Sequence, residues 1–350
     1  MFVKNAWYCA CWDHEVTQSQ NSLIEKKIAG ERVVLYRKQS GQVVALEDRC
    51  PHRQAPLSLG KKEGDSIRCM YHGIKFDDAG QCIEVPGQDT IPPRACVRAF
   101  PVVEKNNWIW VWMGDPEKAD PDLICHSVGP SHPDYNIKAS YVRINSDYRL
   151  EIANLADLTH SSFVHEDTFA MGWAQVHSKP EPQLLERGIK TVIWCRSAPV
   201  PKFVSHMFPE GFLCDAHFSV TQTIPCNWIL HFRVFSAGTA TEGESDGQLL
   251  LDSWSCQAIT PRDEDSVDYY YSWGASKATD RPGFSDMLRE GIDDAFAEDK
   301  AILEGQHKRM KEKPDHQQMS IAADAGPTRI LSVLKKMLKA EEESAGHTAD

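Results

Sequence analysis

The sequence lacks the features that mark membrane-spanning, secreted and nucleotide-binding proteins. No apolar run approaches the roughly 18 residues that a membrane-spanning helix needs. The first residues, MFVKNAWYCACWDHE, contain no basic stretch followed by an apolar core, so we expect no signal peptide. No G-x-G-x-x-G pattern follows a strand-like segment, which argues against a nicotinamide or flavin site. Basic residues are outnumbered, with 38 Lys and Arg against 50 Asp and Glu, and the net charge of −12 argues against a nucleic-acid partner.

What is present is ordinary for a soluble globular protein. Of its 350 residues, 41% are hydrophobic and 25% are charged, and this length suggests two domains that each bury a core. The eleven cysteines are mostly scattered without metal-like spacing. Most of them are expected to be small buried side chains, which favours a reducing, cytoplasmic location.

Four of the metal-binding side chains form one compact pattern. Cys50 and His52 are spaced as C-x-H, and Cys69 and His72 are spaced as C-x2-H. Such a set can close a tetrahedron around zinc, or hold a two-iron, two-sulfur cluster with thiolates on one iron and imidazoles on the other. Zinc sites usually repeat C-x2-C or pair H-x3-5-H, and neither pattern is present here. The spacing therefore favours the cluster, and Gly73 suits a tight loop.

A second candidate metal site begins near the middle of the chain. Asp157 and His160 are three residues apart, so on a helix they would share a face. His165 is five residues further on, which implies a bend before it. Two histidines and one carboxylate are the ligands of non-haem iron(II) oxygenases. The alternative is that these residues are helix caps or surface groups.

The carboxylate that completes this site is sought on a long predicted helix over residues 283–312. Asp299 follows Phe296 by three residues and therefore falls on the apolar stripe of that helix. A carboxylate there needs a metal or a cation, because an unpaired buried charge is costly. Asp293 and Asp294 fall on a wetter face together with Glu290 and Glu298, where solvated charges are expected.

The remaining pattern predicts a β-rich first half and a second half that mixes strands and helices. The domain boundary is placed in the polar segment 114–122, which gives domains of residues 1–118 and 119–350. Strands are predicted at 31–37, 42–48, 107–113, 188–195, 227–236, 248–259 and 266–274. A second helix is predicted from Pro327 to about Lys339, with fraying from Glu341 to Asp350.

At these motifs the chain resembles a known family. The segments CPHRQAPLSLG and CMYHGIKFD are similar to the two cluster-binding loops of Rieske proteins. The loop-bridging cysteines of respiratory Rieske proteins would fall at Ala55 and Tyr71, so that disulfide is absent. The segments KNAWYCACWDHE, EVPGQDTIPP, WIWVWMGDPEKADPD, FAEDKAILEGQ and MSIAADAG extend the likeness. The chain resembles the Rieske non-haem iron oxygenases, in the branch of vanillate O-demethylase, toluenesulfonate methyl-monooxygenase and dicamba O-demethylase.

The resemblance implies an α+β fold, in which an all-β Rieske domain precedes a catalytic domain with a curved antiparallel sheet flanked by helices. It also implies a head-to-tail homotrimer. Asp157 would link His160 to the partner subunit's His72, and Asn154 would lie near the iron without binding it. The implied ligands are Cys50, His52, Cys69 and His72 for one 2Fe-2S cluster, and His160, His165 and Asp299 for one mononuclear Fe(II).

The activity implied is that of a terminal oxygenase. It would use O2 and electrons from a separate reductase, supplied by NAD(P)H, to hydroxylate or O-demethylate a small aromatic acid. Alternatives are cis-dihydroxylation of a ring, an electron carrier without oxygenase chemistry, and a structural zinc protein. The sequence leaves the substrate open; His206, His231 and Arg233 are candidates for binding an anionic group or are ordinary surface residues.

Overall fold

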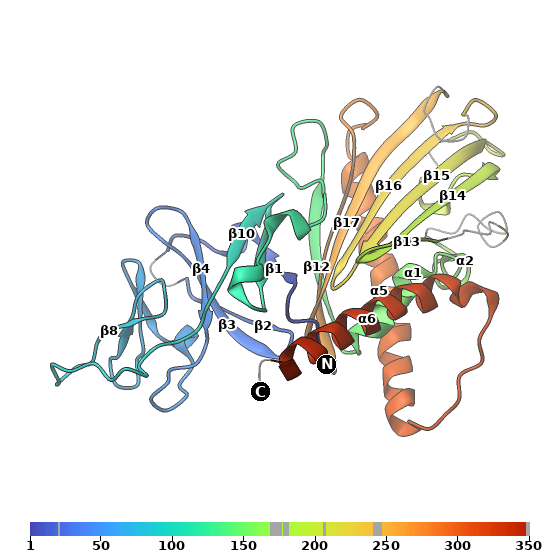
Figure 1. Cartoon of the computed structure of the whole chain (residues 1–350). Helices are drawn as coiled ribbons and strands as arrows, with labels where there is room; N and C mark the ends of the chain where they lie inside the picture. Colours follow the sequence, from blue (N-terminus) through green and yellow to red (C-terminus); the bar gives the residue numbers. More distant parts are fainter. Residues whose placement is uncertain (20–21, 169–176, 178–181, 206–207, 241–246, 348–350) are drawn as a thin grey trace. The chain divides into compact units, whose positions relative to one another are not determined.

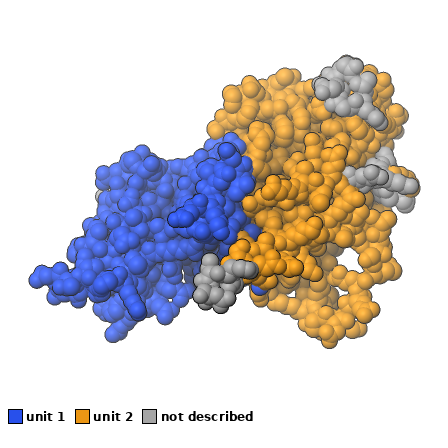
Figure 2. All heavy atoms as spheres, viewed as in Figure 1, with its two compact units in different colours: residues 1–124, 260–263 blue, residues 125–259, 264–350 orange. Residues whose placement is uncertain are grey.

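The chain forms two compact units, which Figure 2 shows in different colours. The computed structural model describes residues 1–350 except 20–21, 169–176, 178–181, 206–207, 241–246 and 348–350. Unit 1 consists of Met1–Ile124 with Thr260–Asp263, and unit 2 of Cys125–Ile259 with Glu264–Asp350. Within the described residues, no helix is both long and apolar enough to be a candidate for crossing a membrane.

The regular secondary structure of unit 1 consists of short strands and 3-10 turns (Figure 1). The strands form three antiparallel sheets, ordered β1-β11-β10, β2-β3-β4-β9 and β5-β6-β7-β8. The strands are β1 (Trp7–Trp12), β2 (Ile24–Ile28), β3 (Glu31–Arg37), β4 (Val43–Glu47), β5 (Lys61–Glu63), β6 (Ser66–Arg68), β7 (Lys75–Phe76), β8 (Cys82–Glu84), β9 (Ala99–Phe100), β10 (Val102–Lys105) and β11 (Trp108–Trp112). The 3-10 turns are η1 (Asp13–Glu15), η2 (Leu57–Leu59), η3 (Pro116–Lys118) and η4 (Pro121–Leu123).

Strand β11 forms the centre of the unit 1 core. All five of its residues are buried, so both faces of the strand are covered by other parts of the unit. Its end residues pair with tryptophans of β1, Trp112 with Trp7 and Trp108 with Trp12, at ring-centroid distances of 5.4 and 5.2 Å. Burying large aromatic side chains contributes strongly to folding because each removes much apolar surface from water.

Unit 2 is organised around one seven-stranded sheet, ordered β12-β18-β17-β16-β15-β14-β13. Its strands are β12 (Lys138–Ile144), β13 (Gln183–Leu185), β14 (Gly188–Pro199), β15 (Leu213–Thr223), β16 (Asn227–Ser236), β17 (Leu249–Asp263) and β18 (Ser266–Ala275). Four of them were predicted. Strands β12, β13 and β15 were missed. In β12 and β15 polar residues interrupt the apolar pattern: β15 buries Asp215, His217 and Gln222.

Five helices are described in unit 2, with the 3-10 turn η5 (Ala322–Asp324). They are α1 (Tyr148–Ala156), α2 (Ser161–Val164), α4 (Lys202–Ser205), α5 (Phe284–Glu312) and α6 (Ala325–His347). Helix α5 packs against β12 and β18, and α1 contacts both α6 and α5. The predicted α+β class and the long helix of residues 283–312 are therefore confirmed.

The predicted fraying from Glu341 is wrong for most of the segment. Helix α6 continues to His347. Lys339 and Glu343, four residues apart on the helix, form an ion pair at 3.5 Å, a spacing that stabilises helices by a few tenths of a kcal/mol. The last three residues, 348–350, lie outside the described part of the chain.

Candidate metal centres

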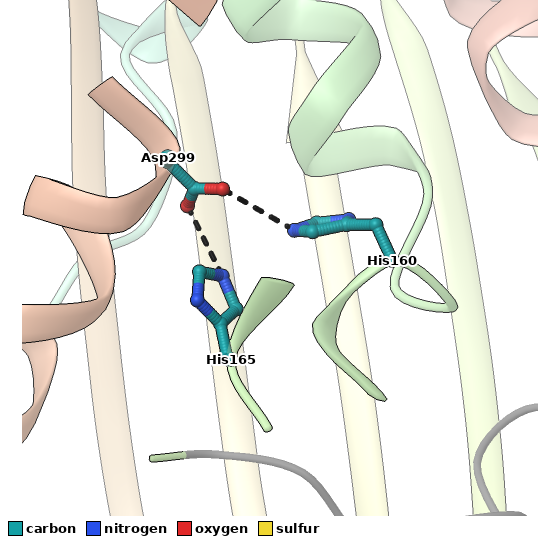
Figure 3. Close-up of side chains that lie close together, drawn as sticks. All are labelled: His160, His165 and Asp299. Atoms are coloured by element: carbon teal, nitrogen blue, oxygen red, sulfur yellow. Dashed lines mark ion pairs between the residues drawn. The ribbon is translucent and has the colours of Figure 1, made fainter. Parts of the chain in front are cut away.

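Three side chains from separate elements of unit 2 converge on one point (Figure 3). His160 precedes α2, His165 follows it, and Asp299 lies on α5. Their potential ligand atoms all lie within 4.8 Å of one another. The Nε2 atoms of His160 and His165 are 3.6 and 3.2 Å from the two carboxylate oxygens of Asp299. A metal ion of the kind held by two imidazoles and one carboxylate fits this arrangement.

Neighbouring groups fix the orientation of both imidazole rings. His165 places Nδ1 2.8 Å from Oε2 of Glu298, and His160 places Nδ1 against the backbone carbonyl of Asp157. With each Nδ1–H donated to an oxygen, each Nε2 keeps its lone pair for a metal. Burial opposes the charged form of His165, but the Asp299 and Glu298 carboxylates raise its pKa.

Asp299 is held in place from helix α1. It is 2% exposed, as its position on the apolar stripe of the helix predicted. The side-chain amide of Asn154 donates to its Oδ1 at 3.1 Å. Because this contact fixes the carboxylate without occupying the metal position, the structure gives Asn154 a place next to the ligand set.

The expectation that Asp157 and His160 share a helix face is wrong. Helix α1 ends at Ala156, and Asp157 has extended backbone angles, φ −112° and ψ 99°. Its carboxylate Oδ1 accepts from the N–H and hydroxyl of Thr159 at 2.8 and 2.7 Å, which closes a turn. The bend therefore precedes His160 rather than separating the histidines. The group next to His160 Nδ1 is also the carbonyl of Asp157, not its carboxylate.

A cavity of about 110 Å³ opens beside the three convergent side chains. Its walls are mainly aromatic and aliphatic, with Phe218, Trp228, Phe232, Trp273 and Phe296 as the rings. An apolar cavity of roughly 150 Å³ holds a benzene molecule, so this space is of the order of one aromatic ring. Outside His160, His165 and Asp299, which we call the triad, Ser161, Ser255 and Gln257 are the lining residues with hydroxyl or amide groups.

The candidate anion-binding residues have other places in the structure. His231 Nε2 lies 2.7 Å from Asp252, and Arg233 donates to His217 at 3.3 Å. Neither residue lines the cavity. His206 lies outside the described residues. Glu298 contacts His165, although helix periodicity predicts a solvated position for it. The cavity residues Ser255 and Gln257 were also not predicted, because they lie on β17 without a distinguishing motif.

In unit 1, two loops of matching geometry carry the C-x-H and C-x2-H patterns. In the first, the N–H of Cys50 donates to the carbonyl of Ala55 and the N–H of Gln54 donates to the carbonyl of Cys50, both at 2.9 Å. In the second, the same bonds join Cys69 to Ile74 and Gly73, at 2.8 and 2.9 Å. Two loops with one hydrogen-bond pattern present their side chains equivalently.

The four side chains sort into a cysteine pair and a histidine pair. The thiols of Cys50 and Cys69 are within hydrogen-bonding distance of each other and lie in a hydrophobic core cluster. The rings of His52 and His72 are exposed, with centroids 4.4 Å apart. Thiolates on one iron and imidazoles on the other are the donor set of a Rieske cluster, so the pairing fits that group.

Gly73 allows the second loop to approach its neighbour closely. Its φ is +76°, in the left-handed region, and a Cβ at this position would lie 2.8 Å from Cγ of Pro86. Any side chain would therefore be strained in its backbone and would collide with Pro86. The residue immediately after His72 is thus restricted to glycine.

Comparisons with known proteins agree with both centres. Residues 6–101 match the Rieske [2Fe-2S] domain, and residues 144–340 match the vanillate O-demethylase oxygenase C-terminal domain. The chain belongs to the Rieske non-haem iron oxygenases. It is an oxygenase component that contains a Rieske 2Fe-2S cluster and a mononuclear iron.

Similar proteins match over nearly their full length. The iron-sulfur subunit of the toluene-4-sulfonate monooxygenase system of Comamonas testosteroni is 34% identical, over 97% of this chain and 98% of that one. The vanillate O-demethylase oxygenase subunit of Pseudomonas sp. strain HR199 is 32% identical, over 99% and 97%. The crystal structure of dicamba monooxygenase bound to dicamba superposes with a TM-score of 0.86 at 28% identity, over 98% and 99%.

Proposed function

We propose that this oxygenase inserts one oxygen atom into a methyl or methoxy C–H bond of a small aromatic substrate. The observation that supports this most strongly is the single-ring cavity, which opens directly onto His160, His165 and Asp299. In the reaction, O2, two electrons and two protons convert C–H to C–OH and release water. From an aryl methyl ether, the hydroxylated carbon leaves as formaldehyde and the ring keeps a phenol.

The residues of the chain have distinct parts in this proposal. Cys50, Cys69, His52 and His72 would hold the cluster, and His160, His165 and Asp299 the mononuclear iron. When bound, the cluster stores an electron and the iron activates O2. Glu298 and the Asp157 carbonyl hold the two imidazoles in the ligating tautomer, and Asn154 holds the carboxylate.

The walls of the cavity orient the substrate and exclude water. The aromatic side chains hold a planar ring by stacking and edge contacts, which keeps one substituent toward the triad. They also exclude water, which strengthens electrostatic interactions within the site. Positioning by the walls therefore decides which carbon of the substrate reacts.

Electrons would come from a separate reductase that takes them from NAD(P)H, and the working assembly would be a head-to-tail trimer. Asp157 would then carry the coupling between the iron of one subunit and the cluster of the next. Its Oδ2 has no hydrogen-bond partner among the described residues, whereas its Oδ1 is held by Thr159. The described structure joins none of the eleven cysteines in a disulfide, which supports a reducing cytoplasm as the location of this assembly.

The coupling role of Asp157 is tested with Asp157→Asn. We expect both iron centres to load normally and turnover to fall by about 100-fold or more, because an amide NH2 in place of Oδ2 cannot accept an imidazole N–H from the neighbouring subunit. Asp167→Asn, which alters an exposed aspartate in the neighbouring segment, is the matched control. Unchanged oxidation of the pre-reduced cluster by O2 and substrate in Asp157→Asn would contradict the coupling role.

The reaction type is tested by product analysis with a panel of methoxy- and methyl-substituted aromatics and a compatible reductase. Formaldehyde or a benzylic alcohol supports the proposal, and a cis-diol identifies ring dihydroxylation instead. An iron content of about three per chain distinguishes the oxygenase from a carrier with about two.

A further inference from the structure

The cavity beside the triad combines a large apolar wall with a single source of hydrogen bonds. Among the described lining residues, the ionisable side chains are His160, His165 and Asp299, and none is a lysine or arginine. An anionic substituent buried there would lose its hydration without gaining a cationic side chain. The described part of the lining thus disfavours the aromatic acid that the family resemblance suggests.

Most polar hydrogens at the cavity wall are already donated to the protein. The indole N–H of Trp228 donates to the carbonyl of Leu155 at 2.8 Å, and that of Trp273 to Oγ of Ser253 at 3.2 Å. The hydroxyl of Ser161 donates to the carbonyl of Leu158 at 2.5 Å. These three side chains therefore present their apolar parts to a ligand.

The exception is a hydrogen-bonded chain of three buried side chains, in which Tyr269 donates to Gln257 and Gln257 donates to Ser255. Tyr269 donates its phenolic hydrogen to Oε1 of Gln257, and Nε2 of Gln257 donates to Oγ of Ser255 at 3.1 Å. All three residues are at most 2% exposed, and Gln257 and Ser255 line the cavity. Among the described residues, Gln257 is the hydrogen-bond partner of the Ser255 hydroxyl, which leaves the hydroxyl hydrogen and the second amide hydrogen to donate.

The direction of this chain is set at its buried end. Burial, together with the carboxylates of Glu151 and Asp299, raises the pKa of Tyr269 well above its ordinary value. The phenol therefore stays protonated at every working pH and remains a donor to Gln257. With one lone pair of the amide oxygen taken by Tyr269, the chain ends at the cavity in two open donors, the Ser255 hydroxyl hydrogen and the second Gln257 amide hydrogen.

We propose that the substrate of this oxygenase is an uncharged aromatic compound carrying a hydrogen-bond acceptor, such as a carbonyl or amide oxygen, which Ser255 and Gln257 bind. This rests on the proposed function, since it places the substrate in the cavity next to the triad. Ser255 and Gln257 contact the acceptor, and Tyr269 is a positioning residue that acts through Gln257. The aromatic walls hold the ring.

The test compares three methoxy-substituted rings that differ in one group, a neutral amide, a carboxylate or a methyl. Anaerobic calorimetric titration of the holoenzyme measures the affinities for 4-methoxybenzamide, 4-methoxybenzoate and 4-methyl-anisole, which lacks the carbonyl acceptor. We expect the amide to bind at least tenfold more tightly than the carboxylate. Ser255→Ala should weaken amide binding about 5- to 10-fold and leave the affinity for 4-methyl-anisole unchanged, because a neutral hydrogen bond is worth about that factor.

Ser272→Ala is the matched control. Ser272 lies on the neighbouring strand β18, is equally buried and loses the same atom, but its hydroxyl donates to the carbonyl of Cys256 at 3.3 Å and does not line the cavity. We expect it to leave the ratio of amide to anisole affinity unchanged. Tyr269→Phe should lower that ratio in the same direction as Ser255→Ala, a change that a general loss of packing would not produce.

Two outcomes overturn the inference: carboxylate binding that equals or exceeds amide binding, or equal losses for amide and anisole in Ser255→Ala. Failure of the proposed function has a different signature. In that case none of the three ligands is oxidised with O2 and reductase although the cluster is reduced, whatever the order of the affinities. Demethylation of the ligands with a preference for the carboxylate would overturn the inference and retain the proposed function.

Discussion

The two metal sites of this chain are constructed in opposite ways. The cluster site uses two loops close together in the sequence, and its histidines are exposed. The iron site is assembled from α2 and α5, with His165 and Glu298 separated by 133 residues, and its carboxylate is buried. The first site is defined by local loop geometry, whereas the second exists only when helices α1, α2 and α5 pack together.

This difference has a practical consequence for mutations. A substitution in a cluster loop acts on a short segment with its own hydrogen-bond pattern. A substitution at the iron site removes one member of a converging set in the interior, where an unpaired charge is costly. The iron site should therefore be lost without loss of the cluster, and Asp299→Ala and Glu298→Ala test this in order of decreasing effect.

Asp299→Ala should have the largest effect. It removes the carboxylate that faces both Nε2 atoms, so we expect the mononuclear iron and all turnover to be lost while the cluster remains. The iron content should fall from about three to about two per chain, with an unchanged visible spectrum. Asp294→Ala, on an exposed face of the same helix, is the control. Loss of the cluster spectrum in Asp299→Ala would show that the two sites are not independent.

Glu298→Ala should have an intermediate effect. It removes the acceptor for His165 Nδ1 and leaves all three ligands in place. Groups in this position typically change metal affinity by about 10- to 100-fold, which a competition titration with an iron chelator would measure. Glu290→Ala, at a more exposed position of the same helix, should leave the affinity unchanged. An equal affinity in the two variants would remove Glu298 from the site.

His217→Gln should change the pH dependence of stability rather than activity. Burial, followed by the charge of Arg233, lowers the pKa of His217 to about 4. Because the unfolded chain takes up this proton near pH 6.5 and the folded chain only near 4, stability is lost as pH falls between these values. The full loss is about 3 kcal/mol. Denaturant titrations at several pH values should show a shallower slope in the variant, whereas exposed His14→Gln should retain the slope.

The fold was predictable where the residue pattern is regular. The predicted strands at 31–37 and 227–236 coincide with β3 and β16, and the long helix differs from α5 by one residue at its start. Strand β15 was missed because tertiary contacts, rather than apolar residues, accommodate its side chains: Asp215 accepts from the backbone N–H groups of Ser197 and Gly238. Single-sequence periodicity does not contain that information.

The iron site was predictable in its residue types but not in its local geometry. Asp299 was identifiable because a carboxylate on an apolar helix stripe needs a partner. The turn before His160 was missed because it depends on the Asp157 carboxylate bonding to Thr159, a local contact that competes with the helix. Helix periodicity predicts that Glu298 is solvated. In the structure His165, from another element, contacts Glu298, so Glu298 becomes part of the site.

The glycine after His72 limits how far evolution or engineering can alter the cluster loop. Its φ is +76°, and a Cβ at position 73 would lie 2.8 Å from Cγ of Pro86, so this position excludes every residue with a side chain. Any replacement must shift the proline segment or rotate the peptide that follows the histidine. The cost of a substitution would therefore fall on the orientation of the neighbouring His72 ring, while the remainder of the unit 1 fold stays in place.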